Sequence, residues 1–343
     1  MTAVKAVALF SGGLDSILAA KVVAEQGVEV LAVQFVTPFF GTEIMADTGY
    51  IKRVKEKYHL DLRLENISNG YLELLRKPLH GFGKNFNPCI DCKILMVSRA
   101  REIMAEIGAS FIISGEVLGQ RPMSQRRDTL NVIARDSGTK MDLLRPLSAK
   151  LMPPTRAETE GLVDRERLYG FSGRGRSAQI ALAGQLGITD FPAPAGGCIL
   201  ADPILSRRIK RVYQGDFVVK PGEISEQDVS LMLLGRQFVL PGGLWFILGR
   251  NKGENQRLKA LASAEDLCFY TKDRPGPFGL LRRGKDHLAD GEVIKKLCGL
   301  VVRYGKKVEN APAGTVAVNG GDRTYFIQTM PLDDEIFSQW LWS

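Results

Sequence analysis

The first half of the chain alternates short apolar runs with segments of helical periodicity. Apolar, β-rich runs that predict strands occupy residues 6–10, 28–35, 61–67 and 111–114. Apolar residues spaced three and four apart predict helices between them, at residues 17–25, 48–58 and 94–107. Strands that alternate with helices predict an α/β fold, in which a parallel sheet is doubly wound with helices on both faces.

The pattern changes near residue 213, where short strands, tight turns and scattered lysines replace this alternation. Strands are expected at residues 245–248, 266–270 and 325–327, and helices at residues 255–262 and 291–304. This mixture predicts a separate C-terminal α+β module. The chain therefore divides into two expected domains, residues 1–213 and residues 214–343.

A glycine turn joins the first expected strand to the first expected helix, in the sequence Ser11-Gly12-Gly13-Leu14-Asp15-Ser16. Glycines let the backbone approach a ligand closely, and the N–H groups at a helix N-terminus attract anions, so the turn can hold a phosphate. Asp15 would repel a phosphate unless it holds Mg²⁺ that bridges to it. A glycine pair after a strand is also a common structural turn. Gln34 and Phe35 end the second strand and are expected to flank the same ligand.

Composition and charge set limits on the class of protein. The chain has 343 residues, of which 45% are hydrophobic, and a formal net charge of +8, which allows a polyanionic partner. No run approaches the ~18 apolar residues of a membrane span, and the N-terminus does not resemble a signal peptide. We therefore expect a cytoplasmic protein without a membrane partner. Five cysteines in such a chain are expected to serve as metal ligands or nucleophiles rather than in disulfides.

Three cysteines lie where they could carry chemistry. Cys89 and Cys92 form a CxxC motif just before a predicted helix, whose dipole is expected to give Cys92 thiolate character. Cys198 follows a turn rich in proline and glycine, residues 191–197. Three thiolates suit a [4Fe–4S] cluster with one open iron, whereas a redox pair with Cys198 as a nucleophile is the alternative. Core or surface roles are expected for the other cysteines and the histidines: Cys268, Cys298, His59, His80 and His287.

Two basic segments precede the C-terminal module. Residues 171–177 join arginines to glycines, which fits either a solvated loop or a contact with a phosphate backbone. A second cluster is expected to bind RNA and consists of Arg207, Arg208, Lys210 and Arg211.

The turn SGGLDS resembles the SGGxDS signature of the PP-loop ATP pyrophosphatases. Residues 115–125 resemble the GExxGQ…SQ segment of 4-thiouridine synthetases. Cys92 follows an Asn-Pro pair, and Cys198 a Gly-Gly pair, as the catalytic cysteines of 2-thiouridylases do. This resemblance implies catalytic roles for Asp15, Cys92 and Cys198. It also implies an ATP site made of Phe10, Ser11, Gly12, Gly13, Leu14, Asp15, Ser16, Gln34, Phe35, Gly115 and Gln120.

The resemblance implies ATP-dependent thiolation of a tRNA uridine. The base carbonyl would be adenylated with release of pyrophosphate, and sulfur would then displace AMP. Cys89, Cys92 and Cys198 would hold the [4Fe–4S] cluster, with sulfide or a cysteine desulfurase as the sulfur donor; a persulfide on Cys198 is the alternative carrier. An amide-forming ATP pyrophosphatase and a non-catalytic RNA-binding adaptor are the rival functions. No THUMP-like or rhodanese-like region is evident in the sequence, so neither the position thiolated nor the sulfur source is specified.

The C-terminal module resembles the NFACT-R RNA-binding domain. The resemblance rests on Gly249-Arg250-Asn251, on Asn255, on Asp266-Leu267 and on residues 275–277, although Cys268 replaces a tryptophan of that pattern. It implies phosphate contacts by basic residues that are scattered through the module. These residues are Arg250, Lys252, Lys272, Arg274, Arg282 and Arg283.

Overall fold

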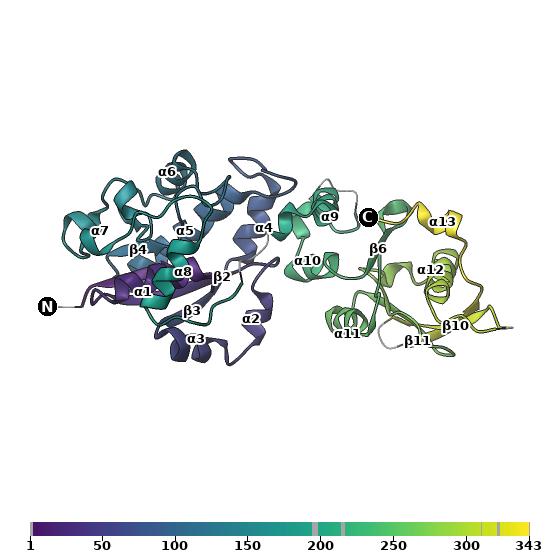
Figure 1. Cartoon of the computed structure of the whole chain (residues 1–343). Coiled ribbons are helices and arrows are strands. Elements are labelled where there is room, and N and C mark those ends of the chain that lie inside the picture. The colour runs from purple at the N-terminus through teal and green to yellow at the C-terminus, as the bar shows by residue number, and fades with distance from the viewer. Residues whose placement is uncertain (1–2, 194–197, 214–216, 310, 321–322, 343) are drawn as a thin grey trace. The chain divides into compact units, whose positions relative to one another are not determined.

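The computed structural model describes residues 3–193, 198–213, 217–309, 311–320 and 323–342, which belong to two compact units, residues 1–199 and 200–343 (Figure 1). None of the described helices is long and apolar enough to cross a membrane.

The first unit contains, within its described residues, five parallel strands in the order β3-β2-β1-β4-β5. These strands are β1 (Lys5–Leu9), β2 (Glu29–Val36), β3 (Asp61–Asn66), β4 (Phe111–Ser114) and β5 (Leu143–Leu144). The chain adds β2 and β3 on one side of β1 and then returns to place β4 on its other side. Ligands of open parallel sheets bind at such a switch point, beyond the carboxyl ends of the strands.

Helices cover both faces of this sheet, which confirms the doubly wound α/β fold predicted from the sequence (Figure 1). They are α1 (Leu14–Ala24), α2 (Thr42–Ala46), α3 (Tyr50–Tyr58), α4 (Ser68–Arg76), α5 (Cys89–Glu106), α6 (Arg127–Asp136), α7 (Arg156–Thr159) and α8 (Ser177–Gln185). Ala6 and Ala8 of β1 pack with apolar residues of α1, α3 and α8. Val7, between them, packs on the opposite face with residues of α5 and α6. Because side chains alternate across a strand, the apolar run of β1 fills two cores.

The second unit is α+β, as predicted. Its described residues form a six-stranded antiparallel sheet in the order β11-β10-β8-β9-β7-β6. The strands are β6 (Arg236–Val239), β7 (Trp245–Leu248), β8 (Leu267–Thr271), β9 (Gly279–Leu281), β10 (Gly314–Gly320) and β11 (Arg323–Thr329). The helices are α9 (Pro203–Tyr213), α10 (Glu226–Met232), α11 (Lys252–Leu261), α12 (Gly291–Arg303) and α13 (Asp334–Ser338). One face of the sheet, including Phe269, Val316 and Val318, packs against apolar residues of α12.

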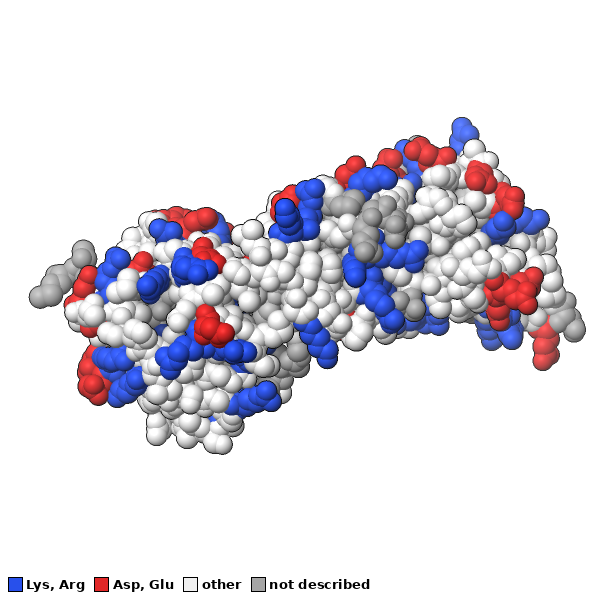
Figure 2. All heavy atoms as spheres, turned by 90° about the horizontal axis from the view of Figure 1, so that it is seen from above, with Lys and Arg blue, Asp and Glu red and all other residues white. Residues whose placement is uncertain are grey.

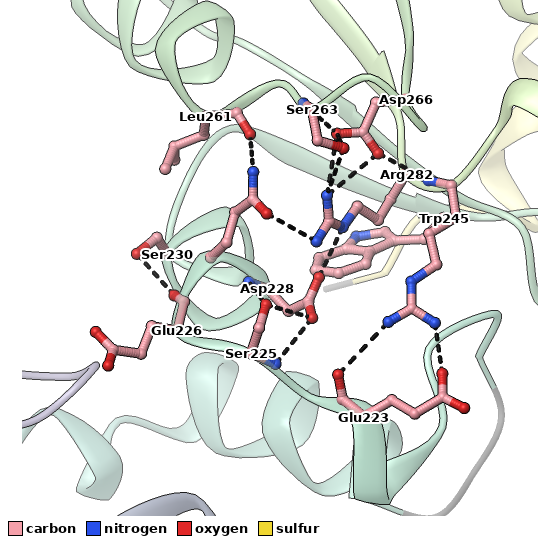
Figure 3. Close-up of polar contacts among 12 residues, drawn as sticks. Glu223, Ser225, Glu226, Asp228, Ser230, Trp245, Leu261, Ser263, Asp266 and Arg282 are labelled. Atoms are coloured by element: carbon pink, nitrogen blue, oxygen red, sulfur yellow. Dashed lines mark hydrogen bonds and ion pairs between the residues drawn. The ribbon is translucent and has the colours of Figure 1, made fainter. Parts of the chain in front are cut away.

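A buried ionic cluster ties α10 to the sheet of the second unit (Figure 3). The Arg282 guanidinium donates to Asp228 of α10 at 2.7 Å, to Asp266 at 3.0 Å and to Gln227 at 3.0 Å. Arg282, Asp228 and Asp266 are all buried, and Ser225 caps α10 through a reciprocal hydrogen bond with Asp228. The sequence-based assignment of Arg282 to phosphate binding is therefore wrong, because two carboxylates occupy its guanidinium inside the protein.

The sequence pattern places the domain change near residue 213, whereas the compact units divide before α9. The physical reason is local, since α9 packs against α10, and α10 is held to the sheet by Arg282.

Candidate nucleotide and cysteine site

The turn after β1 has the geometry of an anion site. Gly12 adopts a left-handed conformation (φ 72°), and α1 begins at Leu14 with no described side chain capping its N-terminus. Ser16 closes the turn, because its Oγ donates to the Gly13 carbonyl at 2.8 Å and accepts from the Ser11 N–H at 3.2 Å. The N–H groups of the first turn of α1 are thus presented beyond the carboxyl end of β1, where a phosphate can accept from them.

Asp15 carries an unsatisfied carboxylate oxygen at this turn. Its Oδ2 accepts from the Gln120 amide at 2.8 Å, while its Oδ1 is buried without a hydrogen-bond partner among the described residues. Gln120 is in turn held by Gln179 of α8, whose amide donates to it at 3.3 Å. A buried acceptor without a partner is costly, and a cation is the partner that a carboxylate oxygen prefers. The orphaned oxygen therefore fits a divalent cation bound beside a phosphate.

Gly115 brings the end of β4 against the start of α1. A Cβ atom at Gly115 would lie 2.6 Å from the Asp15 carbonyl oxygen and 2.7 Å from Ser16 Cα. Only glycine permits this approach of two backbones, so Gly115 determines where Asp15 lies relative to β4.

Gln34 lies at the same edge of the sheet and accepts from the Tyr50 hydroxyl at 2.8 Å. Tyr50 begins α3, and its hydroxyl would lie 3.3 Å from a Cβ atom at Gly12, so it borders the turn. Burial raises the pKa of Tyr50, so the hydroxyl remains a proton donor. Sequence reasoning missed Tyr50, because an aromatic residue in an amphipathic helix gives no signal that distinguishes it from a core residue.

Three of the residues assigned to the nucleotide site, Phe10, Leu14 and Phe35, have their side chains in the hydrophobic cores. Contacts from these three positions to a ligand would therefore come from the backbone.

Cys89, Cys92 and Cys198 all act on one buried tyrosine, Tyr71, which the sequence did not single out. Tyr71 of α4 is fully buried, packs against Phe39 and Phe40, and is hydrogen-bonded through its hydroxyl to Cys92. Burial raises its pKa, and the negative charges of Cys92, Cys198 and Cys89 raise it further. All three thiols therefore lie near a single hydroxyl group. Residues 194–197 of the Pro-Gly turn that precedes Cys198 lie outside the described residues.

The expected thiolate character of Cys92 is contradicted. Burial raises the pKa of the Cys92 thiol to about 12, against the opposing effects of Lys93 and the Tyr71 hydroxyl. Cys92 lies one turn inside α5, and burial of its sulfur is the largest effect on its pKa.

The arrangement of the candidate ligands bears on whether they could hold an iron–sulfur cluster. In the part of the chain that the structure describes, no three His, Cys, Asp or Glu side chains are grouped so as to hold one metal ion. A four-iron cluster is much larger than one ion, so its ligands stand farther apart around it. Cys89, Cys92 and Cys198 all act electrostatically on Tyr71, which keeps these three thiols together as the candidate ligands of such a cluster.

A buried ion pair links the cysteines to the nucleotide turn. Glu116 follows Gly115 directly and pairs with Arg145 at 3.1 Å, and both side chains are buried. Lys93, next to Cys92, lies 3.8 Å from the other oxygen of Glu116. Burial alone would raise the pKa of Glu116, yet the positive charges of Lys93 and Arg145 hold it below its usual value. The Glu116 carboxylate thus links Lys93, which follows Cys92, to the segment at Gly115 that packs against Asp15.

The arginine–glycine segment lies beside this site. The Gly173 N–H donates to the Leu118 carbonyl at 2.8 Å, within the loop that carries Gln120. Arg174 is exposed. This placement leaves both interpretations of the segment open, a solvated loop or a contact with a phosphate backbone.

The basic residues assigned to RNA binding have different surroundings. Arg208 is half-buried. The side chains that lie on the surface are those of Arg207, Lys210, Arg211, Arg250, Lys252 and Lys272. Arg250 pairs with Glu254, and Arg208 donates to the Met232 carbonyl at 3.0 Å. In Figure 2 lysines and arginines are dispersed over the visible face and mixed with acidic residues.

Arg274 is the exception to this exposure, and its assignment to RNA is wrong. It is buried, pairs with Asp273 at 3.1 Å and donates to the carbonyls of Ala311 and Ala313. Its guanidinium organises the chain around residues 311–313 instead of reaching solvent.

The remaining cysteines and histidines have structural surroundings. Cys298 is on the buried face of α12, in the core, and Cys268 is half-buried in β8. His80 pairs with Asp136 at 2.9 Å, and His59 ends α3 in a left-handed conformation.

Comparison with known proteins places both parts of the chain. Residues 1–150 match the family model described as thiamine biosynthesis protein (ThiI), and residues 235–341 match that of the NFACT protein RNA binding domain. A probable tRNA sulfurtransferase of Thermococcus kodakarensis is 34% identical over 146 residues, 42% of this chain and 36% of the relative. The corresponding protein of Methanothermobacter thermautotrophicus is 32% identical over 173 residues, 49% of this chain and 41% of the relative.

The chain thus spans about four-tenths of the length of these relatives. Among solved structures, a 4-thiouridine synthetase–RNA complex with bound ATP matches 60% of this chain and 50% of its own, at 24% identity and a TM-score of 0.41. Both resemblances expected from the sequence are confirmed: residues 1–150 match the ThiI family model, and residues 235–341 match the model of the NFACT RNA-binding domain.

Proposed function

We propose that this chain is an ATP-dependent tRNA sulfurtransferase, which replaces a carbonyl oxygen of a uridine by sulfur. The observation that carries the proposal is the buried Oδ1 of Asp15 at the SGGLDS turn, to which no described residue donates a hydrogen bond. The names of the two curated relatives, probable tRNA sulfurtransferases, support the same reaction class. A tRNA substrate implies a cytoplasmic protein.

ATP is needed because oxide is a poor leaving group. The uridine carbonyl oxygen attacks the α-phosphate of ATP, pyrophosphate leaves, and the carbon then carries adenylate. The N–H groups of the turn and of the α1 N-terminus bind phosphate oxygens, and Gln120 orients Asp15. Mg²⁺ held by Asp15 would neutralise charge on the departing pyrophosphate.

Sulfur replaces oxygen in the second half of the reaction. Cys89, Cys92 and Cys198 would hold a [4Fe–4S] cluster, which would supply an iron with an open position for a sulfur atom from sulfide or a cysteine desulfurase.

The alternative needs no cluster. Cys198 carries a persulfide whose outer sulfur attacks the activated carbon, and AMP leaves with the former carbonyl oxygen. The Cys92 thiolate then attacks the Cys198 sulfur, the thiolated base is released as a disulfide forms, and a thiol reductant restores both cysteines. Because the pKa of Cys92 is raised to about 12, this route requires Cys92 to lose a proton as the site fills.

The carboxylate of Asp15 is tested by Asp15→Asn, which keeps the shape and removes the charge. Single-turnover pyrophosphate release should fall about 10²- to 10³-fold, as when one charged group is removed from a transition state, while tRNA binding persists. The matched control is Asp61→Asn, because Asp61 is exposed and paired with Lys55 on the surface. Wild-type pyrophosphate release by Asp15→Asn would contradict the proposal.

The sulfur step is tested by Cys198→Ala, with Cys298→Ala, on the buried face of α12, as the control in the other unit. Cys198→Ala should adenylate tRNA yet yield no thiouridine when digested nucleosides are measured by mass spectrometry. Normal thiolation by this variant would exclude Cys198. Anaerobic purification separates the two routes, since a brown, oxygen-labile protein contains the cluster and a colourless active one uses the persulfide.

A further inference from the structure

At β8, β10 and β11, α12 packs against one face of the sheet of the second unit. In antiparallel strands, residues directly opposite each other point to the same face. Tyr325, Val318 and Phe269 are opposite one another across β11, β10 and β8, and Val318 and Phe269 belong to the core against α12. Phe326, Ala317 and Tyr270, one residue along on each strand, therefore point to the other face.

On this second face β8 and β11 carry side chains with exposed area, whereas Ala317 of β10, between them, is fully buried. Phe326 is 62% exposed, the largest exposed fraction of any aromatic side chain in the described chain, and Tyr270 is half-buried. Phe326 and Tyr270 are separated by the one intervening strand of Ala317, so their Cα atoms stand about 10 Å apart. Two aromatic residues, one mostly exposed and one half-buried, thus lie on the same face of the sheet on either side of a buried alanine.

The surroundings of the two rings are cationic and polar. The Lys272 ammonium lies 6.0 Å from the centroid of the Phe326 ring. The other residues that the register and its alternation place on this face of the three strands carry no acidic group: Cys268, Thr315, Asn319, Thr324 and Gln328. Besides burial, which raises the pKa of the Cys268 thiol most, two charges act on it: Asp266, which belongs to the buried cluster with Arg282, raises this pKa, and Lys259 of α11 lowers it.

We propose that this face, Tyr270, Ala317 and Phe326 with Lys272, binds single-stranded RNA by stacking unpaired bases on the two rings. Sheets that present aromatic residues to solvent recognise unpaired bases in this way, and a neighbouring cation attracts the backbone. The hydroxyl and amide groups of Thr324, Asn319 and Gln328 can donate to and accept from base edges. The inference rests on the proposed function for its RNA, and it assigns the binding surface, which the family match does not.

The same strand supplies a matched control. Tyr325 precedes Phe326, is 40% exposed and points to the opposite face of the sheet. Replacing either residue removes one exposed ring from β11, so a general effect on β11 would appear in both variants.

The test uses the full chain and a fluorescently labelled ten-nucleotide single-stranded RNA, followed by anisotropy. Phe326→Ala should weaken binding roughly 5- to 150-fold, the range for loss of one stacked base, whereas Tyr325→Ala should bind as the wild type does. Phe326→Trp should retain binding, because it keeps an aromatic surface. A 2-aminopurine base in the RNA should be quenched by the wild type and not by Phe326→Ala. Lys272→Gln should lower the slope of log K against log salt by roughly 0.7.

The outcomes separate this inference from the proposed function. Equal affinities of the wild type, Phe326→Ala and Tyr325→Ala for the RNA overturn the stacking surface, while thiolation of tRNA by the same proteins leaves the proposed function standing. A wild type that binds neither this RNA nor tRNA overturns both. Dimerisation lost in both β11 variants would assign the edge strand to a second copy of the chain and overturn the RNA surface.

Discussion

Gly115→Ala tests whether the approach of β4 to α1 positions the nucleotide turn. The added Cβ would lie 2.6 Å from the Asp15 carbonyl oxygen, 2.7 Å from the Asp15 carbonyl carbon and 2.7 Å from Ser16 Cα. All three atoms are backbone, so no side chain can rotate away. Restoring an ordinary contact of about 3.4 Å requires the start of α1 to move by about 0.8 Å, and overpacking of this kind costs about 1–3 kcal/mol.

The displacement acts on the residues that the proposed chemistry uses. Asp15 and the N–H groups at the start of α1 would move together, and a misplacement near 1 Å lowers a rate by about 10²-fold. We expect Gly115→Ala to fold, with the free energy of unfolding reduced by about 1–3 kcal/mol in urea titrations followed by circular dichroism. Single-turnover pyrophosphate release should fall by about 10²-fold, more than tRNA binding does.

Gly184→Ala is the matched control. Gly184 lies in α8 of the same unit, and a Cβ atom there would meet nothing within 4 Å. Alanine in a helix is favoured over glycine by about 1 kcal/mol, so this variant should be as stable as the wild type or more so, with unchanged activity. Wild-type pyrophosphate release by Gly115→Ala would refute the reasoning, because it would show that the position of α1 does not limit adenylation.

Three further predictions concern buried polar groups. Glu116→Gln leaves the Arg145 guanidinium without its carboxylate and should cost about 3–5 kcal/mol at pH 7 in urea titrations. Because the pKa of Glu116 is lowered on folding, its contribution is present above its unfolded value near 4.3 and is lost as pH falls below it, so the variant's stability should depend less on pH on the acid side. Arg282→Met should destabilise the second unit by about 3–5 kcal/mol, and Arg283→Ala by at most about 1 kcal/mol, in thermal melts; equal losses would contradict the role of the buried cluster. Tyr71→Phe removes the hydrogen bond to Cys92 and should slow thiouridine formation about tenfold with pyrophosphate release unchanged, whereas a loss of pyrophosphate release would place Tyr71 in the nucleotide half.

The sequence predicted the parallel sheet well because its strands are buried on both faces. An apolar run such as Ala6–Phe10 is stable only when it is buried. The glycine turn that follows it marks the edge of the sheet where a ligand can bind. The antiparallel sheet was predicted less completely, since β6 and β10 mix apolar with polar residues and their pairing is set by partners far along the chain.

The errors at the candidate sites share one cause, which is partners distant in sequence. Arg282 resembles a surface arginine until Asp228, on α10, is brought to it by the fold. Cys92 follows the motif of a reactive thiol, but Tyr71 and the packing around it come from α4. Sequence spacing predicts which element a residue occupies, and it does not reveal how deeply neighbouring elements bury it.

The contact between Arg282 and Asp228 also shows that the region matched by the family model differs from the unit that folds. The family-defined region starts at residue 235, yet a carboxylate that neutralises its buried arginine comes from α10, before that start. A fragment that starts at residue 235 would retain every strand of this sheet. Its buried Arg282 would, however, have lost the carboxylate of Asp228. The region that matches the family model is therefore smaller than the unit that folds, and α10 must be included in any fragment meant to fold on its own.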